Sequence, residues 1–231
     1  MWAIMWGMAD SYLSPFALFL GAGSFVLGFI GSGPVLITAL SQLAGAQLLD
    51  KVGRRKPVIL LGQGIQTTTL IPLFLLPLLL PKGGMPALVV CVTIYFFFHG
   101  MTVPPWMSLM GDVVEPAKRG CYFSGRTRIN LLTMTLAMML AGVIAHSWTL
   151  AGLTAVGFGC LFGIALLARS TGMLFVKEHY DAPLEAQEKD SFSFHAFLGD
   201  PQHANYARFT FAIALMNGTA TIAGPFFAVY M

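Results

Sequence analysis

The chain has 231 residues, of which 56% are hydrophobic and only 10% are charged, whereas ordinary soluble domains carry roughly 25% charged residues. This composition excludes a water-soluble monomer and a disordered chain, and the mean hydropathy of +0.74 indicates that lipid is the main solvent. The net charge of +3 is too small to predict a nucleic-acid partner. The three cysteines have neither CxxC nor Cys/His spacing, so we expect no disulfide framework, no metal site and no cofactor.

Long uncharged runs divide the chain into membrane-spanning segments, because about 20 apolar residues in a helix cross the ~30 Å hydrocarbon core of a bilayer. The runs predict seven spans, in chain order 1–20, a second ending at residue 49, 57–80, 85–111, two helices within 129–168, and a last span from residue 209. We expect the break within 129–168 to lie near His146, Ser147 and Trp148. The sequence therefore predicts an all-α membrane protein.

The basic residues orient these spans, because short loops rich in Lys and Arg stay on the cytoplasmic side of a membrane. Twelve of the 13 Lys and Arg residues follow even-numbered spans. They are Lys51, Arg54, Arg55, Lys56, Lys118, Arg119, Arg126, Arg128, Arg169, Lys177, Lys189 and Arg208. The N-terminus and the segment 169–208 are therefore predicted to be cytoplasmic, in a multi-pass protein of the cell (inner or plasma) membrane.

The short loop after the second span carries a sequence motif. Residues 46–56 read AQLLDKVGRRK, which fits the pattern G-x-L-a-D-R/K-x-G-R-R/K except that Ala46 replaces the first glycine. The six matching positions are Leu48, Asp50, Lys51, Gly53, Arg54 and Arg55. In residue types and in place along the chain, this loop resembles the signature loop of the major facilitator superfamily. The alternative is an ordinary positively charged cytoplasmic loop.

The resemblance implies an all-α transporter built from two six-helix halves that move a small solute by alternating access, with a coupling ion as a further partner. Residues 1–168 then form the N-terminal six-helix bundle, 169–208 a cytoplasmic linker, and 209–231 a seventh transmembrane helix that starts the C-terminal half. Both ends of the sequence lie in apolar runs. We therefore expect a chain truncated at both ends, whose partners are the bilayer and the missing C-terminal half.

Two basic loops are expected to gate the cytoplasmic side. An ion pair between Asp50 and its basic neighbours would hold one conformational state and break in the other. The second loop, residues 111–120, resembles the family's loop between spans four and five and contains Arg119, with Arg126 shortly after it. These arginines either take part in the gate or act as interfacial anchors.

Ionisable groups inside a membrane are costly and are functional candidates by default. Asp10 lies halfway along the first span, where it could carry a proton, bind a coupling cation or bind a cationic substrate; the alternative places it near the outer interface. His99 lies near the centre of span four, and packing is its commoner role. Gln63 and Gln66 on span three either contact substrate or form interhelical hydrogen bonds.

Enzyme classes have no support, because HExxH, GxSxG and any pair of intramembrane aspartates are absent from the sequence. We therefore expect no catalytic residues. A non-transporting receptor, scaffold or lipid-moving protein on the same fold is the remaining alternative to a transporter, because a fold alone does not determine function.

Overall fold

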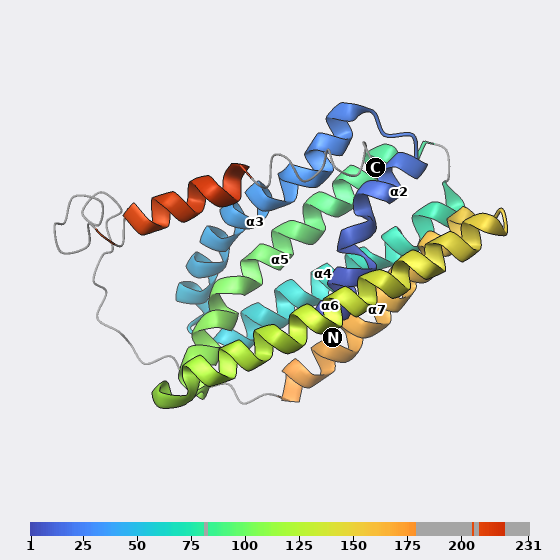
Figure 1. Ribbon diagram of the computed structural model, residues 1–231. Coiled ribbons are helices and arrows are strands. Elements are labelled where there is room, and N and C mark those ends of the chain that lie inside the picture. The colour runs from blue at the N-terminus through green and yellow to red at the C-terminus, as the bar shows by residue number, and fades with distance from the viewer. Residues whose placement is uncertain (81–82, 179–204, 206–207, 220–231) are drawn as a thin grey trace.

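The computed structural model describes residues 1–80, 83–178, 205 and 208–219, and the described regular structure is helical throughout (Figure 1). Five long helices make up the bundle: α3 (Ser24–Val52), α4 (Arg55–Leu79), α5 (Met85–Val113), α6 (Arg119–Leu150) and α7 (Thr154–Glu178). Each belongs to a segment long and apolar enough to cross a membrane. Their outer faces expose Leu, Ile, Val, Phe and Met side chains, as expected of helices that contact lipid.

The N-terminal segment differs from the single span predicted over residues 1–20. It consists of α1 (Trp2–Met8), a 3-10 turn η1 (Asp10–Tyr12) and α2 (Leu13–Phe19). Pro15 has no N–H to donate to the carbonyl of Ser11 four residues earlier, so the backbone just before it cannot keep a regular α-helix. The segment predicted as the first span is therefore interrupted at Asp10, and neither of its two short helices is among the described helices long enough to cross a membrane.

The boundary between the fifth and sixth predicted spans also differs from the prediction. Helix α6 continues through His146, Ser147 and Trp148, and the turn lies at residues 151–153 with Gly152 at a φ of 73°. The polar Ser147 does not break the helix because its hydroxyl donates a hydrogen bond to the Val143 carbonyl at 2.8 Å. Helix α6 also begins at Arg119, well before the apolar run that predicted it.

The predicted boundary between bundle and linker at residue 168 lies inside a helix, because α7 continues to Glu178. Arg169 is therefore a helix residue and not the first residue of a linker. Most of the rest of the predicted linker lies outside the described residues. Residues 208–219 are helical, and all but the first fall within the predicted seventh span.

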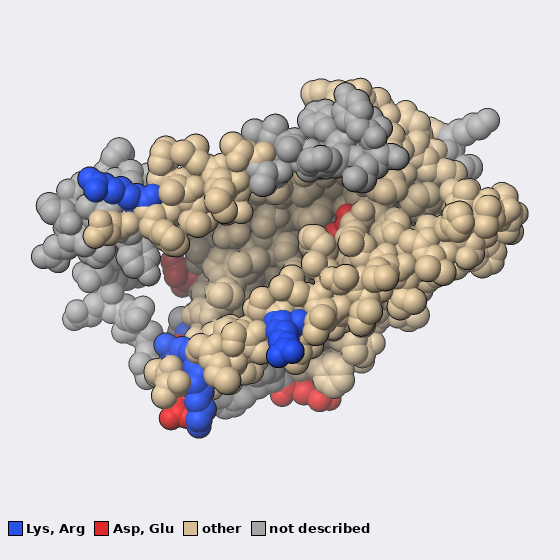
Figure 2. Space-filling view, in the orientation of Figure 1, with Lys and Arg blue, Asp and Glu red and all other residues tan. Residues whose placement is uncertain are grey.

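Helix α5 packs against both α3 and α4, while α7 packs against α4, α6 and α1. Small residues allow the close contact of α3 with α5. A Cβ atom at Gly100 would overlap Ser41 and the Thr38 backbone, and one at Gly45 would overlap the Met101 carbonyl. One face of the bundle is hollowed between α3 and α6 (Figure 2).

Candidate functional site

A buried polar cluster lies where α1, α4, α5 and α7 meet. Tyr95 donates a hydrogen bond from its hydroxyl to Asp10 Oδ1 at 2.7 Å. Arg169 donates from Nη2 to Gln66 Oε1, also at 2.7 Å. The exposed fraction is 1% for Tyr95, 0% for Gln66 and 6% for Arg169. An acid and a base thus share one apolar interior.

These residues come from the middle of the bundle and not from its ends. Gln66 lies one residue from the midpoint of α4, and Tyr95 lies one helical turn before His99, the midpoint of α5. Asp10 lies at the break between α1 and α2. Interrupted helices near the bilayer midplane are where transporters place substrate and coupling-ion sites, because the break frees backbone groups for binding.

The sequence predicts Arg169 to be a cytoplasmic flanking charge, so its position in this cluster was not expected. The length of the apolar run before Arg169 nevertheless indicated that this residue lies within a helix. The apolar run 154–168 has 15 residues, which as a helix spans only about 22 Å and cannot cross ~30 Å of hydrocarbon. The helix had to continue past Arg169 through Leu174, Phe175 and Val176. Tyr95 had no comparable signal, because it lies in an aromatic run that reads as ordinary lipid-facing or core sequence.

Two cavities flank the cluster. The first has a volume of about 740 Å³ and is lined by Asp10, Trp6, Thr38 and Gln42 among others. The second has a volume of about 510 Å³. Both volumes are in the range of small-molecule sites, roughly 300 to 1,000 Å³. His99 lines both cavities. Its ring stacks on Trp2 at a centroid distance of 6.3 Å, which fixes its position between them.

The polar residues in the middle of α4 divide into two groups. Gln66 forms the interhelical hydrogen bond described above, and Gln63 is buried and lines the second cavity. Thr67 and Thr69 instead donate to carbonyls of their own helix, those of Gln63 and Gln66 respectively, each at 2.7 Å. Within the described residues there is no group of three or more His, Cys, Asp or Glu side chains that could hold a metal ion.

The signature loop connects α3 to α4. Helix α3 ends at Gly53, whose φ of 67° is in the left-handed region and whose N–H donates to the Leu49 carbonyl at 2.8 Å. Glycine suits this position because a side chain would be strained there. Asp50, Lys51 and Arg54 have exposed side chains around this turn.

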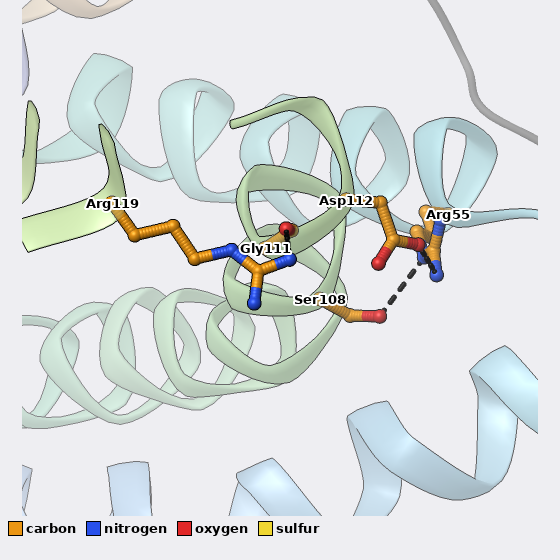
Figure 3. A network of polar contacts seen from close by, with 5 residues as sticks. All are labelled: Arg55, Ser108, Gly111, Asp112 and Arg119. Atoms are coloured by element: carbon orange, nitrogen blue, oxygen red, sulfur yellow. Dashed lines mark hydrogen bonds and ion pairs between the residues drawn. The ribbon is translucent and has the colours of Figure 1, made fainter. Parts of the chain in front are cut away.

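Arg55, the last residue of the motif, is buried (Figure 3). It forms an ion pair with Asp112 and donates from Nε to Ser108 Oγ at 2.9 Å, which ties the start of α4 to the end of α5. Asp112, which lies in the second basic loop predicted from the sequence, is therefore a further candidate gate residue beside Asp50.

The two other predicted gate arginines lie on α6. Arg119, at its start, caps the end of α5: its Nε donates to the Val114 carbonyl at 3.1 Å and its Nη2 donates to the Gly111 carbonyl. Arg126 lies over the Trp106 ring, with its guanidinium carbon 5.7 Å from the ring centroid. Arg119 therefore contacts the end of the bundle, whereas Arg126 points into the second cavity.

The family model described as Major Facilitator Superfamily matches residues 2–231. The chain belongs to the major facilitator superfamily. Membership confirms the resemblance that the signature loop indicated, together with the all-α membrane fold, and it implies a transporter and not an enzyme. Comparison with curated proteins and comparison with solved structures each found no match.

Proposed function

We propose that this major facilitator protein is an ion-coupled secondary transporter in which Asp10 binds and releases a proton as a small solute crosses the membrane. The observation that carries the proposal is the position of Asp10. It lies at the break in the first span, accepts a hydrogen bond from Tyr95, and lines the larger cavity. A carboxylate within a membrane-embedded bundle carries an unfavourable free energy of burial. A role in proton transport would explain its presence there.

The surroundings of Asp10 connect its protonation to the rest of the bundle. Helix α5 contributes the titratable groups Tyr95 and His99, and α7 contributes the cationic Arg169. Helix α3 contributes only neutral polar groups to this cavity, such as Thr38. Protonation of Asp10 removes its attraction for Arg169, which changes the electrostatic contact between the first span and α7. A two-state bundle biased in this way can couple proton binding to conformation.

The basic end of the bundle supplies the proposed gate on the cytoplasmic side. The Arg55–Asp112 ion pair holds α4 to α5, and the side chains of Asp50 and Lys51 are exposed at the same end of the bundle. Alternating access needs contacts that form in one state and break in the other, and ion pairs at helix ends meet that need. The orientation rests on the positive-inside distribution of the basic loops.

The test uses the full-length protein in liposomes that contain a trapped pH-sensitive dye. Monosaccharides, amino acids, carboxylates and organic cations are added in turn, and proton movement into or out of the lumen is recorded. We expect at least one solute to move protons. In the Asp10→Asn protein this solute-driven proton movement falls to the level of protein-free liposomes, while exchange of labelled for unlabelled solute continues.

Glu115→Gln is the matched control, because Glu115 is an exposed acid that pairs with Lys118 at the surface. It should behave as wild type. Solute-driven proton movement that survives in Asp10→Asn would contradict the role of Asp10. Binding of a solute without movement across the bilayer would favour a receptor on the same fold.

A further inference from the structure

The two cavities on either side of His99 differ in charge. The first contains Asp10, and no Lys or Arg is among its described lining residues. The second is lined by Arg126 and Arg169, and its described lining contains neither Asp nor Glu. The second cavity is therefore cationic, although it lies among membrane-spanning helices. A cationic cavity of this kind attracts an anionic ligand strongly, because the surrounding low dielectric weakens screening.

Arg169 has hydrogen-bonding capacity to spare. Its side chain is more than nine-tenths buried, and its Nη2 is used by Gln66, but its Nε has no hydrogen-bond partner in the part of the chain that the structure describes. The Oε1 of Gln63 is also buried without a described partner and belongs to the same cavity, but as an acceptor it could bind only a donor on the body of a ligand and not a carboxylate. Buried polar groups are normally satisfied, so such groups beside a cavity point to a ligand.

We infer that the second cavity binds the solute as an organic anion, with its carboxylate held between Arg169 and Arg126. The guanidinium group binds carboxylates in a planar, often bidentate geometry. The rest of the cavity wall is largely apolar and includes the aromatic side chains of Trp2, Trp106 and Phe175, which suits an apolar or ring-bearing body. This inference rests on the proposed transport function and names its substrate class.

The cluster also connects this anion to Asp10. Arg169 lines the anion cavity and belongs to the same buried polar cluster as Asp10, so a bound carboxylate and the Asp10 carboxylate both interact with the charge of the arginine. With Asp10 ionised and the anion bound, two negative charges face Arg169. A proton on Asp10 removes one of them. Anion and proton therefore favour each other's binding, which is the requirement for moving them in the same direction.

The test measures binding to the full-length protein in nanodiscs, using quenching of tryptophan fluorescence. The probe is 4-nitrobenzoate, and its neutral isostere 4-nitrobenzamide is the comparison. Trp2 and Trp106 both line the cavity, so a bound nitroaromatic ring quenches them. Because a hydrogen bond to a charged group contributes about 1.5 to 3 kcal/mol, the carboxylate should bind at least about tenfold more tightly than the amide. Equal affinities would overturn the inference.

Two arginines of α6 supply matched variants. Arg126→Gln should weaken 4-nitrobenzoate binding about tenfold, whereas Arg128→Gln, which changes an exposed arginine outside the described cavity lining, should leave it unchanged. The Arg169→Gln protein should lose binding. If the Arg169→Gln protein fails to fold, the comparison of Arg126→Gln with Arg128→Gln still tests the inference. Equal effects of these two substitutions on 4-nitrobenzoate binding would overturn it.

Lipid composition distinguishes a solute from an anionic lipid headgroup. Binding should be the same in discs of phosphatidylcholine and in discs that contain phosphatidylglycerol; competition by the anionic lipid would assign the cavity to headgroups and overturn the solute assignment. The Asp10→Asn protein should keep carboxylate binding. If Asp10→Asn keeps solute-driven proton movement while Arg126→Gln loses binding, the coupling proposal fails and the anion site stands.

Discussion

The ion pair between Arg55 and Asp112 allows a quantitative prediction about how the ends of α4 and α5 are held together. The Arg55 side chain is 5% exposed and that of Asp112 is 50% exposed. Removing one partner of a fully buried pair costs about 3 to 5 kcal/mol, whereas exposed pairs contribute about 0.2 to 1 kcal/mol. A pair with one buried and one half-exposed member lies between these values, so we expect a coupling free energy of about 2 kcal/mol.

The measurement is a double-mutant cycle of Arg55→Met and Asp112→Asn. The cycle is needed because Arg55 also donates to Ser108, so Arg55→Met alone removes more than the ion pair. Reversible unfolding in mixed micelles, followed by tryptophan fluorescence, gives the free energy of each variant. A coupling of about 2 kcal/mol corresponds to roughly a 30-fold change in the unfolding equilibrium constant.

The same chain provides an exposed control pair. Lys118 and Glu115 lie three residues apart at an N–O distance of 2.7 Å, and their side chains are 76% and 61% exposed. The cycle of Lys118→Met and Glu115→Gln should give less than about 1 kcal/mol. If the Arg55–Asp112 coupling is no larger than that of the control pair, burial does not strengthen this contact and the reasoning is refuted.

Two further predictions concern packing and orientation. Gly100→Ala should destabilise the protein by about 1 to 3 kcal/mol in the same unfolding assay, because its Cβ would meet the backbone of α3, whereas Gly28→Ala, with open space around it, should not. A membrane-impermeant maleimide should label the exposed Cys121 in inside-out vesicles but not in intact cells, and Ala151→Cys, at the opposite end of α6, should show the reverse pattern. The same labelling from both sides would contradict the proposed orientation.

The signature loop shows what could be predicted without coordinates. Asp50, Gly53 and Arg55 are neighbours in the chain, and their spacing identified the family that the comparison confirmed. The left-handed turn at Gly53 is a local property as well, because only the backbone of one residue is involved. The burial of Arg55 against Asp112 was not predictable in this way, since it depends on how α4 and α5 lie against each other.

The sequence by itself determined that this is a multi-helix membrane protein of a transporter family. Length, hydropathy and the positions of charges are properties of the chain, and a bilayer of fixed thickness converts them directly into spans and loops. Asp10 was singled out for the same reason, because a charge within an apolar run is visible without knowledge of its neighbours.

Only the tertiary structure decided which side chains meet. Asp10, Tyr95, Gln66 and Arg169 come from four separate helices, and their contacts depend on the rotation of each helix about its own axis. In soluble proteins an amphipathic pattern reveals that rotation, but these helices are apolar on every side because lipid and core are both apolar. The face of each helix that turns inward is therefore set by packing, and the cationic cavity became visible only once the helices were assembled.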